Sequence, residues 1–177
     1  MGLLEKLNPL RRTAVPEPAR VCEGDPQVIC APVSGQVVSL EEVGDPAFSQ
    51  GMLGCGLGIR PEEGVVFSPV SGTVAADVET KHALLIRADS GVEVLLHVGL
   101  DSVSLGGTGF RAFAHKGDRV HAGQPLIEFD RRLMRERGLD DTVLVTVTNA
   151  GDLSHVEESA PAGDEVAAGA VVMRARR

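Results

Sequence analysis

Two histidines, His82 and His97, are the residues of this chain best placed to do chemistry. Each lies beside an apolar run, and Arg87–Gly91 between the runs is typical of a tight turn, so the segment is predicted to form a β-hairpin. With a two- or four-residue loop, paired residue numbers have odd sums and both imidazoles lie on one sheet face, whereas a three-residue loop would separate them. Two imidazoles on one face can bind a metal, or one can act while the other assists.

The composition limits the kind of protein that this can be. At 177 residues the chain is long enough for one sizeable core. Its net charge of −8 argues against a general nucleic-acid binder and favours partners that carry positive charge. Its three cysteines, which have no Cys-x-x-Cys spacing, are predicted to be reduced thiols. With no transmembrane run and no secretory signal, we expect a cytoplasmic protein.

Turn and strand signals dominate the chain and predict an all-β fold. The pattern Pro-Val-Ser-Gly-x-Val occurs at Pro32–Val37 and again at Pro69–Val74, each time with a turn directly before a strand, which suggests a duplicated hairpin unit. Further turn and strand segments are expected at Lys116–Ile127, Thr142–Thr148 and Gly169–Met173. One helix is expected between an Asp130 cap and Gly138. We therefore predict a single antiparallel β-sandwich or barrel-like domain with short helical turns.

The N-terminal segment differs from the rest of the chain. Residues 1–23 are predicted to form a flexible tail and linker, and residues 24–177 the domain. Within residues 1–12, Leu3, Leu7 and Leu10 have helical spacing, and Lys6, Arg11 and Arg12 are available to face acidic headgroups. Two interpretations stay open here: a short amphipathic segment with weak membrane contact, or a frayed tail, because Pro9 limits any helix to about two turns.

Taken together, six motifs resemble the glucose-type enzyme IIA of the bacterial phosphoenolpyruvate–sugar phosphotransferase system. The motifs are Ala31–Val37, Gly44–Phe48, Glu79–Ala83, Asp89–Glu93, Leu96–Asp101 and Gly123–Asp130. The resemblance extends from Ala31 to Val172 and includes the Met-Gly-Leu start. It implies a phosphocarrier, in which the small protein HPr passes a phosphoryl group to a histidine, which passes it to a cysteine in the IIB domain of a sugar permease.

The resemblance also implies a role for individual residues. His97 matches the phosphorylated nucleophile, His82 the assisting histidine that stabilises the phosphoryl group, Thr80 the hydroxyl that orients His82, and Gly99 the carbonyl that orients His97. Six residues are expected to contact partners: Asp45, Phe48, Val78, Leu95, Val98 and Asp101. Three of these, Val78, Leu95 and Val98, stand where members often have Phe, so the apolar patch is expected to be flatter.

Two other classes of function share parts of this sequence pattern. A zinc hydrolase of the lysostaphin-type peptidase class fits the spacing between His97 and Asp101, but its companion His-x-His motif is absent. A biotinyl or lipoyl carrier needs a modified Lys at a hairpin tip, where this chain has Asp89–Gly91. No cofactor is expected to be required, although His82 and His97 can bind zinc if a partner protein supplies a third ligand.

The partners follow from the same resemblance. We expect HPr, the IIB domain of a separate permease chain of the IIBC type, and regulatory targets whose identity the sequence does not give. Nucleic acid is not expected, and the absence of a phosphate-binding Gly-rich loop argues against direct use of ATP. The protein is expected in the cytoplasm, at the inner face of the membrane when it engages the permease, and the sugar is left open.

Overall fold

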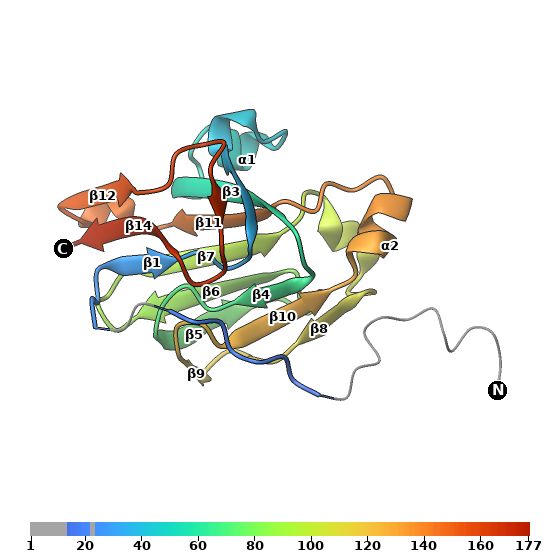
Figure 1. Ribbon diagram of the computed structural model, residues 1–177, viewed down its shortest axis with the longest axis horizontal. Helices are drawn as coiled ribbons and strands as arrows, with labels where there is room; N and C mark the ends of the chain where they lie inside the picture. The colour runs from blue at the N-terminus through green and yellow to red at the C-terminus, as the bar shows by residue number, and fades with distance from the viewer. Residues whose placement is uncertain (1–13, 22–23) are drawn as a thin grey trace.

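The computed structural model describes residues 14–21 and 24–177, so the amphipathic or frayed segment predicted over residues 1–12 lies outside the described residues. Within the described part of the chain, no helix is both long and apolar enough to cross a membrane. The prediction of an all-β antiparallel fold is confirmed: the described residues form β-strands that pair antiparallel, with only short helical segments between them (Figure 1).

Three sheets make up the sandwich. The large sheet has eight strands in the order β13-β2-β3-β11-β7-β6-β5-β9. Their bounds are β13 Glu165–Val166, β2 Gly35–Ser39, β3 Cys55–Pro61, β11 Val143–Val147, β7 Glu93–Val98, β6 Ala83–Ala88, β5 Gly72–Asp77 and β9 Arg119–Val120. The two three-stranded sheets are β1-β14-β12, with bounds Val28–Cys30, Val171–Arg176 and His155–Glu158, and β4-β10-β8, with bounds Val65–Phe67, Pro125–Phe129 and Phe110–Ala112.

The helical segments are short and lie between strands. They are η3 Leu40–Glu42, α1 Pro46–Ser49, η4 Ser102–Leu105, α2 Arg131–Glu136 and η5 Ala150–Asp152. The predicted helix is confirmed as α2: the Asp130 side chain accepts a hydrogen bond from the backbone of Leu133 at 3.0 Å, and Gly138 follows its end with a positive φ. In Figure 1, α1 lies at the top of the molecule and α2 at its right side.

The core lies between the sheets and consists almost entirely of aliphatic side chains. In β7 the alternation is clear, since Val94, Leu96 and Val98 are fully buried while Leu95 and His97 on the opposite face are half-buried. β11 pairs with β7 and is buried along its whole length. His97 therefore projects from a strand whose other face is fixed by the core.

The duplicated Pro-Val-Ser-Gly motif builds two equivalent corners. β2 and β5 each begin at the glycine of their motif, and they pair with β13 and β9 respectively. The serine of each motif accepts a backbone hydrogen bond from an alanine in the opposing turn: Ser34 from Ala168 at 2.9 Å, and Ser71 from Ala122 at 3.0 Å. The prediction of a duplicated unit is thus confirmed down to the hydrogen bonds of its serines.

Residues 19–21 pack across the turns of both corners. The Ala19 amide donates to the Gly123 carbonyl at 2.8 Å. A Cβ on Gly169 would overlap the Arg20 carbonyl, and a Cβ on Gly123 would lie 2.5 Å from the Ala19 carbonyl oxygen, so both turns need glycine for this close approach. Ala19 and Arg20 therefore contact the domain, although the sequence assigned them to the tail.

The hairpin of β6 and β7 differs from the prediction. Its loop is the three residues Asp89–Gly91, closed by a hydrogen bond from the Ala88 amide to the Val92 carbonyl at 2.8 Å. Ala83 consequently pairs with His97, so the expected odd sums are wrong, and continued alternation would have placed His82 on the opposite face. The alternation ends before His82, however, because β6 begins only at Ala83.

Candidate functional site

His97 is held at one ring nitrogen. Its Nδ1 lies 2.8 Å from the Gly99 carbonyl oxygen. A carbonyl can only accept, so Nδ1 carries the hydrogen and the lone pair is on Nε2. A neutral imidazole in this tautomer is a nucleophile that is already oriented.

Gly99 is required by both its backbone conformation and its surroundings. Its φ is +73°, and a Cβ there would overlap the Met134 Cε of α2 and lie 2.8 Å from the Asp140 carbonyl oxygen. Its amide donates to the Thr142 carbonyl at 2.8 Å, which ties the turn to the start of β11. Met134, the Asp140 carbonyl and the Thr142 carbonyl therefore hold the Gly99 turn, whose carbonyl orients His97.

His82 reaches His97 from outside its strand. Lys81 has a φ of +60°, so the chain turns sharply just before His82 and β6 starts only afterwards. The two imidazole rings meet edge to face, with centroids 4.8 Å apart and an interplanar angle of 81°. The predicted pairing of the two histidines is thus present in the structure, but the Lys81 turn produces it and the strand register does not.

Thr80 is the hydrogen-bonding partner of His82. Its Oγ1 lies 2.7 Å from His82 Nδ1. When the hydroxyl donates to Nδ1, the hydrogen of the ring is on Nε2. His82 can then donate from Nε2 to a group bound beside His97, while His97 offers a bare Nε2. The two rings have complementary roles in this arrangement.

Both imidazoles are neutral at physiological pH. Burial, together with the neighbouring His97, lowers the pKa of His82 to about 4. Burial also lowers the pKa of His97, although the hydrogen bond to Gly99 and the charge of Asp45 act in the opposite direction. A neutral His97 keeps its Nε2 lone pair available, as the nucleophilic role requires.

Phe48 lies in α1 and Asp45 directly precedes this helix, and both residues act on His97. The Asp45 side chain caps α1 by accepting from the Ala47 amide at 2.8 Å. The Phe48 ring packs edge-on against His97, with centroids 5.2 Å apart, and only 2% of the residue is exposed. The expectation that Phe48 contacts partners is corrected, because its side chain is buried beneath the site.

Of the other four residues expected to contact partners, three are accessible and one is buried. Val78 is 40% exposed, Asp101 is exposed and Leu95 is half-buried, so all three can be reached from outside. Val98 has no exposed surface, because it occupies a core-facing position of β7, and the expectation that it contacts partners is corrected. Asp101, with a φ of +55°, directly precedes η4.

Val103 was not identified from the sequence. It lies in η4, two residues after Asp101, and is 57% exposed. The segment after η4 returns to the site, since a Cβ on Gly107 would lie 3.6 Å from the Cα of Thr80. The only available signal was an isolated valine between two serines just after a site motif, which does not by itself indicate exposure.

The described residues contain no group of three or more His, Cys, Asp or Glu side chains that could hold a metal ion. His82 and His97 together offer two imidazoles, and Asp101 does not join them to form a ligand set. A zinc hydrolase needs three protein ligands and an open position. The hydrolase alternative therefore lacks its metal centre in the part of the chain that the structure describes.

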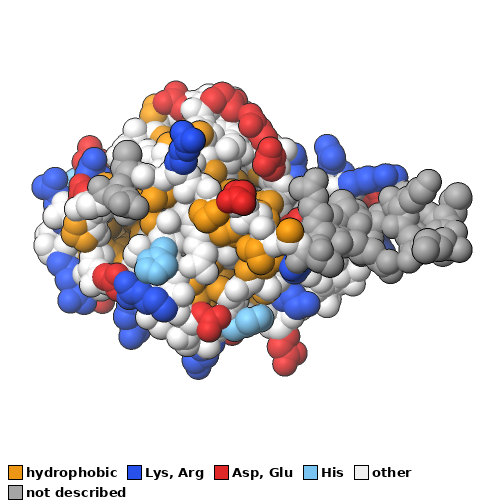
Figure 2. Space-filling model, turned by 60° about the horizontal axis from the view of Figure 1, so that its bottom comes forward, with side chains coloured by type: hydrophobic (Ala, Val, Ile, Leu, Met, Phe, Trp, Pro, Cys, Tyr) orange, Lys and Arg blue, Asp and Glu red, His pale blue; other side chains and the backbone are white. Residues whose placement is uncertain are grey.

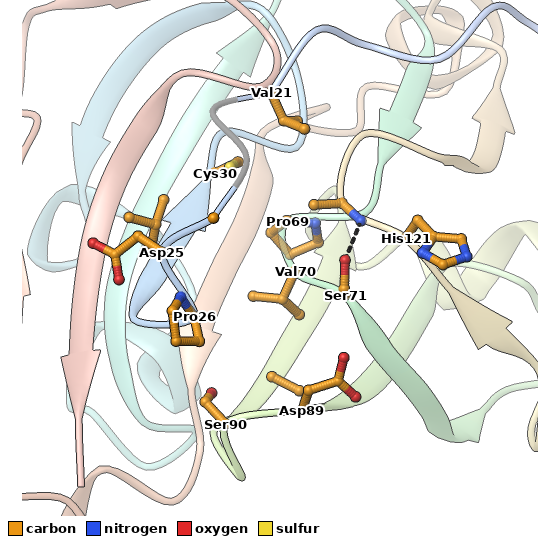
Figure 3. A pocket seen from close by; sticks show the side chains of 14 residues that line it. Val21, Asp25, Pro26, Cys30, Pro69, Val70, Ser71, Asp89, Ser90 and His121 are labelled. Atoms are coloured by element: carbon orange, nitrogen blue, oxygen red, sulfur yellow. Dashed lines mark hydrogen bonds between the residues drawn. The ribbon is translucent and has the colours of Figure 1, made fainter.

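A cavity of about 460 Å³ lies elsewhere, at the tip of the β6–β7 hairpin. Figure 3 shows Asp89 and Ser90 of that tip on one side, with Pro26, Val70 and His121 around them. Neither His82 nor His97 lines it. His121 is exposed, as predicted, and so are the two other histidines outside the site, His115 and His155.

Comparison with known proteins points in the same direction as this geometry. Residues 27–153 match the family model described as phosphoenolpyruvate-dependent sugar phosphotransferase system, EIIA 1. The chain is 45% identical over 123 residues to the PTS system glucose-specific EIIA component of Bacillus cereus, covering 70% of this chain and 74% of that protein. It is also 45% identical over 134 residues to the PTS system beta-glucoside-specific EIIBCA component of Bacillus subtilis, covering 76% of this chain but only 22% of that longer protein.

A solved structure matches as well. It is the glucose permease IIA from Mycoplasma capricolum, with a TM-score of 0.70 and 36% sequence identity. The match covers 82% of this chain and 93% of the other.

Proposed function

Because this chain belongs to the EIIA 1 family of the phosphoenolpyruvate-dependent sugar phosphotransferase system, and is a phosphocarrier for sugar uptake, we propose that Nε2 of His97 carries the phosphoryl group. The observation that carries this proposal is the hydrogen bond from His97 Nδ1 to the Gly99 carbonyl. It leaves Nε2 as the one free nucleophilic atom of a neutral ring.

Acceptance is an in-line displacement. The Nε2 lone pair of His97 forms a bond to phosphorus as the bond from phosphorus to the donor histidine of HPr breaks. The phosphorylated ring keeps its hydrogen on Nδ1 and so carries a positive charge, which the Gly99 carbonyl and the Asp45 carboxylate stabilise. His82 donates from Nε2 to a phosphoryl oxygen, with Thr80 holding its tautomer.

Donation reverses these changes with a different acceptor. The thiolate of a IIB cysteine forms a bond to phosphorus as the bond to His97 Nε2 breaks, and His97 returns to the neutral tautomer. The His82 hydrogen bond supports the charge that moves between the nitrogen, the phosphoryl oxygens and the sulfur. No metal or other cofactor is needed for either step.

Domains of this family interact with HPr and with IIB domains, and in some relatives the EIIA part belongs to a longer EIIBCA chain. For this chain the accessible residues around His97 suggest where partners dock: Val78, Leu95 and Val103 supply apolar surface, and Asp45 and Asp101 supply negative charge beside it. A net charge of −8 favours a basic partner surface. Elsewhere the surface is mixed, and on the face in Figure 2 acidic and basic side chains surround a central group of hydrophobic ones.

Further parts of the proposal rest on sequence and chemistry alone. The protein works in the cytoplasm, at the inner face of the membrane, and donates to the IIB domain of a sugar permease. Residues 1–12 add a weak membrane contact. Zinc can bind His82 and His97 when a partner protein supplies a third ligand, but transfer does not require it.

Labelled phosphoenolpyruvate, enzyme I and HPr test the assignment. The wild-type chain should take up an acid-labile phosphate, and phosphorus–nitrogen NMR couplings should place it on Nε2 of His97. His97→Gln should take up none, whereas His115→Gln, at an exposed histidine, should label normally. Label on His97→Gln at the wild-type rate, or a phosphate on Nδ1, would overturn the assignment.

A further inference from the structure

We propose that Phe48 is a positioning residue for His97, acting within this chain to fix the ring for phosphoryl transfer rather than contacting a partner. The proposal rests on the assignment of His97 as the phosphorylated residue. It starts from two observations: Phe48 is 2% exposed, and its ring centroid is 5.2 Å from that of His97 at an interplanar angle of 64°.

A single hydrogen bond does not fix an imidazole. The bond from Nδ1 to the Gly99 carbonyl defines one direction but lets the ring tilt about the line that joins the two atoms. Two rings limit this tilt, since His82 packs at 4.8 Å and 81° and Phe48 packs at 5.2 Å and 64°. Edge-to-face pairs of this kind have a preferred geometry, so they resist rotation of the ring.

Phe48 is itself held too firmly to move toward a partner. It belongs to a small apolar cluster with Leu40, Val43 and Leu144, each of which is at least nine-tenths buried. The helix that carries it is fixed at both ends: Asp45 caps its start, and the Gln50 amide donates to the Pro46 carbonyl at 3.0 Å. Leaving this cluster to reach the surface would expose a large aromatic side chain to water.

The arrangement makes a kinetic prediction that separates the two roles. A positioning residue changes the rate at which the bound phosphoryl group is transferred, because a small tilt of Nε2 takes it out of line with the phosphorus. A contact residue changes how tightly the partner binds. Phe48→Leu should therefore lower the maximal rate of acceptance by about tenfold and leave the half-saturating concentration of phospho-HPr within about twofold of wild type.

Val78→Ala provides the matched comparison, since Val78 is 40% exposed and lies two residues before Thr80 in the sequence. It should raise the half-saturating concentration and leave the maximal rate close to wild type. Rapid-mixing measurements over a series of phospho-HPr concentrations give both quantities for each variant. If Phe48→Leu cannot be folded, Phe48→Met is measured in its place, because Met fills the same space without an aromatic ring.

NMR of the imidazole nitrogens gives a second readout that a merely structural role would not move. In Phe48→Leu the His97 ring signals should show exchange between orientations, while those of the exposed His115 should match wild type. A raised half-saturating concentration with an unchanged maximal rate would overturn the proposal and make Phe48 a contact residue. A wild-type chain that takes up no phosphate on His97 would instead overturn the assignment on which the proposal rests.

Discussion

The hydroxyl oxygen of Thr80 lies 2.7 Å from Nδ1 of His82, although the residue between them, Lys81, has a left-handed backbone conformation. The turn at Lys81 lies between the two residues, and the hydroxyl meets the Nδ1 nitrogen of the His82 ring. Thr80 thereby selects the tautomer in which His82 donates from Nε2, and several predictions about the transfer steps depend on that selection.

Thr80→Val should impair onward transfer. Val keeps the shape of Thr but removes the hydroxyl, so His82 is no longer held in one tautomer. We expect the rate of phosphoryl transfer to IIB to fall by about tenfold, the worth of a hydrogen bond of about 1.4 kcal/mol. Thr80→Ser should restore it, because Ser supplies the same hydroxyl. A Thr80→Val rate equal to wild type would show that Thr80 does not orient His82.

His82→Gln should separate the two transfer steps. HPr's phosphoryl group is already activated, whereas donation to a thiolate needs charge stabilisation at the leaving nitrogen. The variant should accept phosphate from HPr yet fail to support sugar phosphorylation by a reconstituted permease. His121→Gln, at an exposed histidine, should do both. Normal sugar phosphorylation by His82→Gln would refute this division of labour.

Asp101→Asn should slow encounter with HPr at low salt. Asp101 is exposed at the start of η4, so its charge acts mainly by steering a basic partner, and salt screens such steering. The gap to wild type should narrow as salt rises in stopped-flow transfer from phospho-HPr. Glu165→Gln is the control, since Glu165 is an exposed acid in β13, four strands from β7. An unchanged salt slope for Asp101→Asn would remove Asp101 from the interface.

Gly99→Ala should destabilise the fold as well as the site. The methyl group would have to displace Met134 and the Asp140 carbonyl while φ stays at +73°. We expect a loss of roughly 3 kcal/mol in the free energy of unfolding, measured with urea. Gly151→Ala is the matched control, because a Cβ there meets nothing within 4 Å. Equal stability of the two variants would mean that the Gly99 turn relaxes freely.

The free energy of unfolding should fall as the pH is lowered from about 6.5 toward the pKa of folded His82, which is about 4. The pKa of His82 is about 4 in the folded chain and near 6.5 when exposed, so below about pH 6.5 the unfolded chain binds the proton first. His97, whose pKa is also lowered, contributes with the same sign. His82→Gln should lose less stability than wild type between pH 7 and pH 4.5, by about 2 kcal/mol in urea titrations. Parallel curves for the two proteins would contradict this.

Much of the fold could be predicted because its signals are local. The Asp130 cap, the β-branched run that became β11 and the turns before β2 and β5 depend on neighbouring residues, and all are present. The meeting of His82 with His97 was also predicted, but for a reason that is wrong. The hairpin loop has three residues, which by strand alternation would place the two histidines on opposite faces of the sheet. The turn at Lys81 brings His82 to His97 all the same. A single non-glycine residue with positive φ leaves little trace in a sequence.

The errors at the site concern burial. Val98 and Phe48 stand at positions that the family resemblance associates with partners, yet both are inside. Val98 is buried because side chains alternate along β7, and Val98 lies on the same core-facing side as Val94 and Leu96. For Phe48 the decisive contacts come from Leu40, Val43 and Leu144, and a cluster that joins residues about a hundred positions apart is not visible in local patterns.

The crossing of residues 19–21 over Gly123 and Gly169 has a consequence for fusion and labelling of this protein. A fluorescent tag or second protein joined ahead of Ala14 would be attached near a fixed point on the sandwich, because the Ala19 amide donates a hydrogen bond to the Gly123 carbonyl. A chain shortened to begin at residue 24 would lose that anchor, and the two glycine turns that it covers would face water. Tags are therefore best attached with residues 14–21 retained.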